Sequence, residues 1–298
     1  MSTAPWTIGR LLQWTADYLK SHGSDSPRLD AEVLLAEAMK CQRIQLYTAF
    51  DNEPSEEVRT AFREMVRRRA EGTPVAYIVG HREFYSLDFR VTPDVLIPRP
   101  ETELLVIALL DLAKTRTGGT GLASGTHAMK IADVGTGSGI IAVCAAKHLP
   151  DCRVTAIDIS PAALEVAKFN AEKHSVAGRI EFVEGNLLAG IPAEKTFDFI
   201  LSNPPYVAES EFEALAPGVK NYEPRRALVA GANGTEAIES LIPQSAERLH
   251  PGGYLIMEIS PMIHDRVCVL LAAESRFEPA STIKDLARLP RVVQARKK

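Results

Sequence analysis

The stretch with the clearest chemical character is Asn203-Pro204-Pro205-Tyr206, which follows the apolar run at 197–201. A short, continuous apolar run predicts a buried strand, so the motif should lie where that strand ends. The two prolines restrict the backbone and would hold the Pro204 carbonyl rigidly. Asn203 offers a side-chain oxygen and Tyr206 an aromatic face. The motif therefore combines two fixed hydrogen-bond acceptors with a stacking surface, which suits a planar –NH2 group.

A planar –NH2 group that is conjugated to a carbonyl or an aromatic ring is a poor nucleophile, because its lone pair is delocalised. Methylation becomes easier when both of its hydrogens are bonded by acceptors and the nitrogen can pyramidalise. Asn203 and Pro204 can supply these acceptors, and hydrogen bonds that tighten as charge develops stabilise the transition state selectively. The alternative is that the two prolines only end a strand.

A glycine-rich turn with the spacing G-x-G-x-G places Gly135, Gly137 and Gly139 between a predicted strand and its helix. Glycine lets the backbone turn tightly and approach a ligand closely. The spacing differs from the G-x-G-x-x-G of dinucleotide folds, so it favours S-adenosylmethionine. Close packing of a strand against a helix also uses such glycines, and this alternative stays open.

Polar residues follow two further predicted strands. Asp158 comes about 20 residues after the glycine-rich turn, where a carboxylate can accept both hydroxyls of a ribose. Asn186 and Leu187 follow the next strand, where they could bond an adenine amine and cover its face. Ligands of open α/β sheets bind at the carboxyl ends of the strands, so these residues should meet at one edge.

The rest of the chain supplies elements that could position these residues. Helical periodicity covers 8–23, 27–40 and 55–72, and the last ends in the arginine cluster 67–69. That cluster could be a solvated helix end or a docking face. From Tyr77 to Pro98 the apolar period becomes two, which predicts a β-hairpin. A helix over 99–114 and a Gly-, Ser- and Thr-rich loop over 117–128 precede strands alternating with helices. This alternation predicts a doubly wound, mostly parallel α/β sheet.

Composition narrows the classes of function. The 298 residues carry a net charge of −4, which argues against a nucleic-acid substrate. Four cysteines without CxxC spacing indicate reduced thiols, and the seven histidines lack ligand spacing, so we expect no metal. The first residues do not form a signal peptide, and no apolar run approaches the roughly 20 residues of a membrane span. We expect a cytoplasmic protein without membrane contact.

Six segments together resemble the bacterial release factor glutamine methyltransferases, the PrmC/HemK family, and the resemblance spans nearly the whole chain. They are VLIPRPETELLV, DVGTGSGIIAV, DISPAALEVAKFNA, LSNPPYV, YEPRRAL and PGGYLIMEI. The resemblance implies a Rossmann-like, seven-stranded methyltransferase domain. It also implies methylation of the side-chain amide nitrogen of the Gly-Gly-Gln glutamine in class-1 peptide chain release factors, with S-adenosylhomocysteine as the second product.

The resemblance also implies residue roles. S-adenosylmethionine would be held by Gly135, Thr136, Gly137, Ser138, Gly139 and Asp158. Asn203 would contact both the donor and the glutamine amide, and Pro204, Pro205 and Tyr206 would contact the amide. The N-terminal helices would dock the release factor. Family members often carry Asp at the position of Asn186, which puts its adenosine contact in doubt.

Two flanking segments allow two interpretations each. Arg99 and Glu101 could line the substrate entrance, or the prolines beside them could only set the start of a helix. Glu223 and Arg225 could clamp a loop over the substrate or form a structural ion pair.

We predict a helical docking domain at 1–75, a hairpin linker at 76–98 and a methyltransferase domain at 99–298. The rival functions are methylation of a glutamine in a ribosomal large-subunit protein and, further away, adenine-N6 methylation of nucleic acid.

Overall fold

The structure is a computed structural model that describes residues 5–116 and 128–298. The chain forms two compact units. One takes in the residues up to His81 together with Ala216–Tyr222, and the other takes in Arg82–Leu215 and Glu223–Lys298. The loop predicted over 117–128 falls almost entirely outside the described residues. No helix of the described part is long and apolar enough to cross a membrane.

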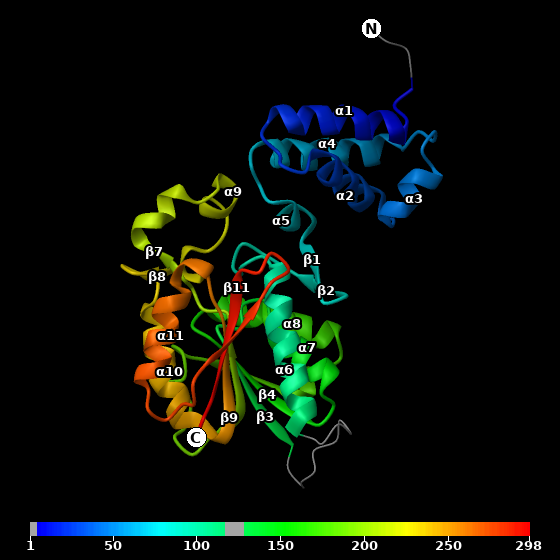
Figure 1. Ribbon diagram of the computed structural model, residues 1–298. Helices are drawn as coiled ribbons and strands as arrows, with labels where there is room; N and C mark the ends of the chain where they lie inside the picture. The colour runs from blue at the N-terminus through cyan, green and yellow to red at the C-terminus, as the bar shows by residue number, and fades with distance from the viewer. Residues whose placement is uncertain (1–4, 117–127) are drawn as a thin grey trace. The chain divides into compact units, whose positions relative to one another are not determined.

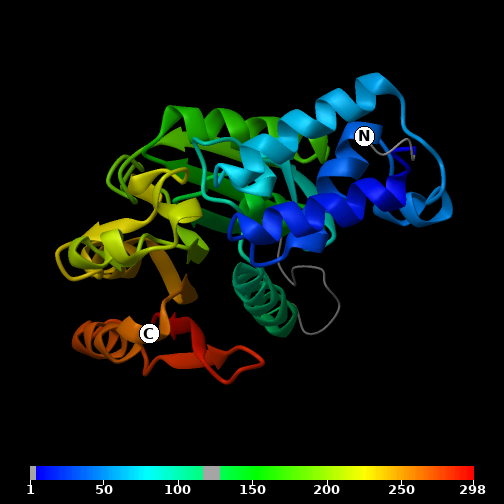
Figure 2. The same ribbon diagram turned by 90° about the horizontal axis from the view of Figure 1, so that it is seen from above.

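The first unit is a bundle of helices: α1 (Ile8–Ser21), α2 (Pro27–Met39), α3 (Arg43–Thr48), α4 (Glu56–Ala70) and α5 (Val75–Val79). Its core is apolar, and α2 packs against both α1 and α4 (Figures 1 and 2). Thr7 and Ser55 cap α1 and α4 by accepting hydrogen bonds from the N–H groups of Arg10 and Val58. The short helix α9 (Pro217–Lys220) belongs to the same unit.

The arginines that end α4 have partners inside this unit. Arg69 Nε donates to Asp30 Oδ2 at 2.7 Å, and Arg67 pairs with Glu64 and Glu71 along its own helix. Both members of the Arg69–Asp30 pair are mostly buried, so Arg69 is part of the bundle's structure. The sequence suggested either a solvated helix end or a docking face for these arginines, and neither interpretation includes the pairing of Arg69 with Asp30.

A two-residue turn joins β1 (His81–Phe84) to β2 (Leu87–Arg90). Tyr85 and Ser86 have φ of 49° and 58°, the left-handed conformation that hairpin turns of this length require. The hairpin is therefore shorter than predicted. Tyr77 lies in α5, where Pro74 precedes the first turn and Gly80 ends the helix in a left-handed conformation. No strand forms over 91–99, where Pro93 and Pro98 remove backbone donors.

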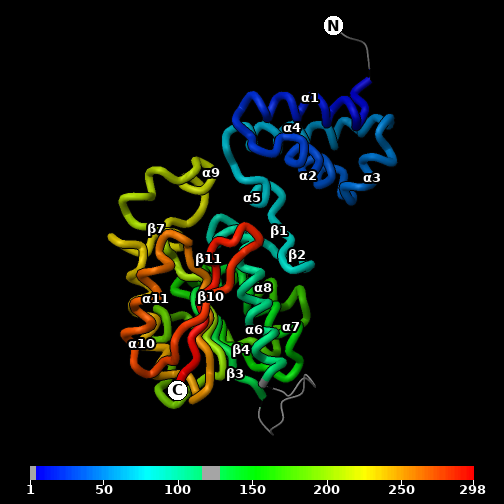
Figure 3. Tube along the Cα trace, in the orientation of Figure 1, coloured from blue at the N-terminus to red at the C-terminus, as the bar shows by residue number. Residues whose placement is uncertain are grey.

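The second unit is built on a seven-stranded sheet with the order β10-β11-β9-β6-β3-β4-β5. The strands are β3 (Met129–Val134), β4 (Cys152–Asp158), β5 (Ile180–Glu184), β6 (Phe197–Ser202), β9 (Leu249–Glu258), β10 (Ser281–Lys284) and β11 (Pro290–Arg296). Strands β5, β4, β3, β6 and β9 pair in parallel. At one edge β11 pairs antiparallel with β9, and β10 pairs antiparallel with β11; the chain through β10 and β11 can be followed in Figure 3. The strand order reverses between β3 and β6, where open α/β sheets place their ligands.

Helices cover both faces of this sheet (Figure 1). One apolar core lies under α6 (Glu103–Arg116), α7 (Ile140–His148) and α8 (Pro161–Lys173), and the other lies under α10 (Glu236–Arg248) and α11 (His264–Ala273). The predicted α/β architecture is confirmed. A small parallel sheet of β7 (Val207–Ala208) and β8 (Val229–Gly231) follows the carboxyl end of β6.

Candidate active site

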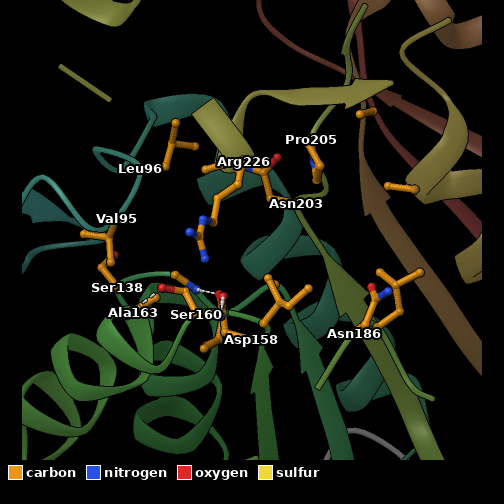
Figure 4. Close-up of a pocket in the computed structure, with 18 of the residues that line it drawn as sticks. Val95, Leu96, Ser138, Asp158, Ser160, Ala163, Asn186, Asn203, Pro205 and Arg226 are labelled. Carbon is orange, nitrogen blue, oxygen red and sulfur yellow. Dashed lines mark hydrogen bonds between the residues drawn. The ribbon is translucent and has the colours of Figure 1, made fainter. Parts of the chain in front are cut away.

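A cavity of about 550 Å³ opens at the carboxyl ends of β3, β4, β5 and β6 (Figure 4). Ten of the residues predicted for the site line it: Arg99, Gly135, Thr136, Gly137, Ser138, Asp158, Asn186, Leu187, Asn203 and Pro205. Its size lies within the range of small-molecule sites. Gly139, Glu101, Pro204 and Tyr206 were predicted with them but are not among the lining residues.

The glycine-rich turn needs its glycines. Gly135, Gly137 and Gly139 have φ of 73°, 53° and 81°, a conformation that side chains disfavour. A Cβ on Gly139 would also lie 3.0 Å from the Cβ of Ala167 on α8. At Gly135 and Gly137 a Cβ would meet nothing within 4 Å. Gly139 therefore serves helix packing, while the other two leave open space beside the backbone.

Asp133, the penultimate residue of β3, holds this turn in place through hydrogen bonds to its buried carboxylate. Its Oδ2 accepts hydrogen bonds from the Thr136 hydroxyl at 2.6 Å and the Ala142 N–H at 3.0 Å. Its Oδ1 has no partner among the described residues. Burial raises the pKa of the carboxyl to about 7, against the lowering effect of these two hydrogen bonds.

Asp158 ends β4, one strand away from the turn. Its Oδ2 accepts from the Gly137 N–H and its Oδ1 from the Ser160 N–H, both at 2.9 Å (Figure 4). These bonds fix the carboxylate at the edge of the cavity. Each carboxylate oxygen can accept more than one hydrogen bond, so both can still receive a hydroxyl.

Leu187 has a left-handed backbone with φ of 53°. This conformation costs conformational free energy in any residue with a large side chain. The next N–H, that of Leu188, donates to Gln244 Oε1 of α10 at 2.9 Å and helps to hold the loop. Leu187, Asn186 and Gln244 all line the cavity. Backbone strain of this kind concentrates at ligand sites.

The Asn203-Pro204-Pro205-Tyr206 segment is held at both ends. Before it, the Ser202 hydroxyl donates to the Val134 carbonyl at 2.7 Å, which ties β6 to the end of β3. After it, the Val207 N–H donates to the Leu228 carbonyl at 2.9 Å. A Cβ at Gly234 would lie 2.7 Å from the Tyr206 carbonyl oxygen, so that residue must be glycine for the loop to pack there. Asn203 Nδ2 donates to Thr102 Oγ1 at 3.2 Å.

The Tyr206 side chain is partly buried and does not line the cavity. Burial raises the pKa of its phenol to about 12, and the negative charge of Glu258 adds to the effect. The phenol therefore stays neutral at every pH at which the protein would work.

The structure distinguishes between the two interpretations that the sequence allowed for the segments around Arg99 and Glu223. Arg99 lines the cavity and donates to the buried carboxylate of Glu223 at 2.5 Å. Arg225 pairs instead with Glu209 on the surface.

Pro100 occupies the first turn of the 3-10 helix η1 (Pro100–Thr102), which supports its role in starting the helix. Glu101 is 41% exposed and lies 4.0 Å from Arg291.

Besides Asp133 and Gln244, four residues of this region were not predicted from the sequence. Thr102 lines the cavity, and Glu258 is buried at the end of β9. Asn170 of α8 is buried and hydrogen-bonds the backbone of both Arg90 and Ser138, so it ties β2 to the glycine-rich turn. Arg226 reaches into the cavity toward Asp158 and Ser160 (Figure 4). Among the described residues, no group of three or more His, Cys, Asp or Glu could hold a metal ion.

Comparison with known proteins agrees with this geometry. The PrmC N-terminal domain family matches residues 10–80, and the methyltransferase small domain family matches residues 120–217. The hMettl16 catalytic domain, solved in complex with a MAT2A 3′UTR hairpin, shares the fold. Its TM-score is 0.54 at 18% identity, over 78% of this chain and 82% of that one.

Two curated relatives align over almost their full length. The release factor glutamine methyltransferase of Rhodopirellula baltica is 49% identical, over 98% of this chain and 97% of its own. That of Koribacter versatilis is 41% identical, over 98% of this chain and 99% of its own. The chain therefore belongs to the release factor glutamine methyltransferase family.

Proposed function

We propose that the protein transfers a methyl group from S-adenosylmethionine to the side-chain amide nitrogen of the glutamine in the Gly-Gly-Gln motif of class-1 peptide chain release factors. The observation that carries the proposal is the position of Asn203. It lines the same cavity as the glycine-rich turn and Asp158, in a chain 49% identical to a release factor glutamine methyltransferase. The residue proposed to act on the amide and those proposed to hold the nucleoside therefore line one cavity.

The residues that line the cavity support S-adenosylmethionine as its ligand. The open space beside Gly135 and Gly137 admits a ligand close to the backbone. Asp158 offers two fixed carboxylate oxygens to the ribose hydroxyls. Asn186 and Leu187 would flank the adenine, and the guanidinium of Arg226 could pair with the donor's carboxylate. When bound, the donor supplies an electrophilic methyl group and leaves as S-adenosylhomocysteine.

The residues of the motif would act on the glutamine amide. Asn203 Oδ1 and the Pro204 carbonyl accept its two N–H hydrogens, which draws the nitrogen lone pair out of conjugation. The amide nitrogen would accept the donor's methyl group, with S-adenosylhomocysteine as the leaving group, and would then lose one proton to water. No strong base is needed, because that proton becomes acidic after transfer. The acceptors lower the barrier because the hydrogen bonds strengthen as positive charge builds on nitrogen.

The helical unit would bind the release factor through a surface of its own. A groove of about 760 Å³ runs between α1 and α4 and contains Trp14, Tyr18 and Arg63. Trp14 is 51% exposed and stacks on Tyr18, with 5.1 Å between the ring centroids. Exposed tryptophan and arginine side chains are the residues that most often dominate protein interfaces. This surface would recognise the body of the release factor.

The test is a competition for label. The protein is incubated with S-adenosylmethionine carrying a labelled methyl group, a class-1 release factor, the ribosomal large-subunit protein and oligonucleotides. We expect label on the release factor. Label on the ribosomal protein alone would support the rival glutamine substrate, and label on oligonucleotides alone would remove the amide chemistry from the proposal.

A further inference from the structure

Asn170 of α8 joins two segments of the second unit that are far apart in the chain. Its Oδ1 accepts from the Arg90 N–H at 2.8 Å, and its Nδ2 donates to the Arg90 carbonyl at 3.0 Å. Nδ2 also donates to the Ser138 carbonyl at 2.8 Å. Arg90 ends the linker strand β2, and Ser138 lies in the glycine-rich turn that lines the cavity. One amide group therefore bonds both the linker and the turn.

The direction of these three bonds is fixed by the partners. All three are backbone groups, so the Arg90 N–H can only donate and the two carbonyls can only accept. The orientation of the Asn170 amide therefore does not depend on the protonation of any side chain. Asn170 is 0% exposed, and both hydrogens of its –NH2 group have an acceptor. A buried amide keeps such partners, because leaving them unpaired is costly.

The turn has two further contacts that hold it. A Cβ on Gly139 would lie 3.0 Å from the Cβ of Ala167, which is three residues before Asn170 on the same side of α8. The helix therefore packs directly against the backbone of the turn. The Gly137 N–H donates to Asp158 Oδ2 at 2.9 Å. Hydrogen bonds thus lead from the carboxylate proposed to bind the ribose, through the turn, to Asn170 and β2.

We propose that Asn170 is a positioning residue that couples the donor-binding turn to the linker strand β2. The inference rests on the proposed function in taking S-adenosylmethionine as the ligand of the turn. A turn that is restricted by its ligand keeps the Ser138 carbonyl in one place, and Asn170 then holds Arg90 more firmly. Coupling of this kind is reciprocal, so the bonds to Arg90 also strengthen donor binding.

The first test measures backbone hydrogen exchange in the wild-type protein. We expect saturating S-adenosylmethionine to slow exchange of the Arg90 N–H by at least ~5-fold, the lower end of coupling between sites. The Tyr85 N–H is the control, because it lies in the same hairpin and donates to Glu103 Oε1 rather than to Asn170. Equal slowing of the two N–H groups would overturn the inference, because it would report only general stabilisation by a ligand.

The second test measures the Kd of S-adenosylmethionine by calorimetry. Asn170→Ala should raise this Kd by ~10-fold and remove the difference between the two N–H groups. Lys173→Ala is the matched control, because it breaks another contact between α8 and β2, the ion pair with Asp88, and should leave the Kd unchanged. Leu271→Ala, at a buried position of α11, controls for loss of stability. A Kd raised equally by Leu271→Ala would give Asn170 a structural role only and overturn the inference.

The outcomes separate this inference from the proposed function. A protein that methylates no glutamine but shows the donor-dependent slowing at Arg90 would refute the function and leave the coupling standing. A protein that methylates the glutamine without this slowing would refute the coupling alone, and one that does not bind S-adenosylmethionine would refute both. If Asn170→Ala does not fold, the exchange measured in the wild type decides.

Discussion

The guanidinium of Arg99 and the carboxylate of Glu223 join two segments 124 residues apart, with 2.5 Å between Nη2 and Oε1. The second carboxylate oxygen accepts from the Ile97 N–H at 3.2 Å. The Glu223 side chain is 1% exposed and that of Arg99 is 31% exposed. This pair connects the segment before α6 to the YEPRRAL segment, and both segments contribute residues to the cavity.

Removal of Arg99 should therefore destabilise the protein more than its surface position suggests. Arg99→Ala leaves the Glu223 carboxylate buried without its counter-charge, and breaking such a pair costs about 3–5 kcal/mol in the free energy of unfolding. Arg225→Ala is the matched control, because it breaks an ion pair with Glu209 that is exposed on both sides and worth at most about 1 kcal/mol. Urea unfolding of both variants gives the comparison. Equal losses would show that Arg99 and Glu223 are not coupled in this way.

Tyr206 should contribute its ring rather than its hydroxyl. Its pKa of about 12 keeps the phenol neutral, so it cannot act as a base near neutral pH. We expect Tyr206→Phe to keep kcat within about 3-fold, and Tyr206→Ala to lose ~10-fold or more as the packing beside the amide is lost. The pH dependence of kcat between pH 8 and 10 should not differ between Tyr206→Phe and the wild type. A Phe variant as slow as the Ala variant would assign the hydroxyl a role.

Glu258 should make the stability of the protein depend on pH. Burial raises the pKa of its carboxyl from 4.5 to about 7, and Glu101 adds to this, against the hydrogen bond from Thr102. The folded protein then holds a proton that the unfolded chain has already lost between pH 4.5 and 7. The free energy of unfolding therefore falls as pH rises through this window, by about 3 kcal/mol at about 1.4 kcal/mol per pH unit.

Glu258→Gln removes this contribution. Its advantage in Tm over the wild type should be larger at pH 8 than at pH 5. The variant should still lose stability as pH rises, because it keeps Asp133, whose pKa is also about 7, so its curve of Tm against pH flattens only in part. Glu165→Gln serves as the control, because that carboxyl is 71% exposed and does not contribute to the pKa of Glu258. A Tm difference between Glu258→Gln and the wild type that does not change with pH would contradict the assignment.

Trp14 should matter for the intact protein substrate only. We expect Trp14→Ala to raise KM for a full-length release factor by ~10-fold, as at other exposed aromatic anchors. The value of kcat/KM for a short Gly-Gly-Gln peptide should stay unchanged, because the peptide lacks the body of the release factor. Leu286→Ala, at a fully exposed apolar side chain of the other unit, is the control. An equal loss with the peptide would place the effect of Trp14 in folding rather than in docking.

Much of the architecture could be predicted because it depends on local patterns. The apolar strand at 197–201 and the glycine-rich turn at 135–139 each carry their signal within a few residues. The rule that ligands bind at the carboxyl ends of parallel strands then brought Asp158 and Asn203 together. Short helices such as α3 and α5 carry too few residues to show a helical period.

The missed residues depend on contacts between distant segments. Thr102 is 101 positions from Asn203, and Asn170 is 80 positions from Arg90. Their side chains are unremarkable in the sequence, because a buried threonine or asparagine gains its role from the partner that folding brings to it. Glu258 did leave a signal, since an acidic residue stands near the end of the apolar strand 253–259. The left-handed backbone of Leu187 left none.

The most direct test of the central claim locates the methyl group. A class-1 release factor is treated with S-adenosylmethionine and either the wild-type protein or Asn203→Ala, and its peptides are then analysed by tandem mass spectrometry. We predict one methyl group on the side-chain nitrogen of the Gly-Gly-Gln glutamine, formed at least ~100-fold more slowly by the variant. A methyl group at any other position, or an undiminished rate with Asn203→Ala, would contradict the account.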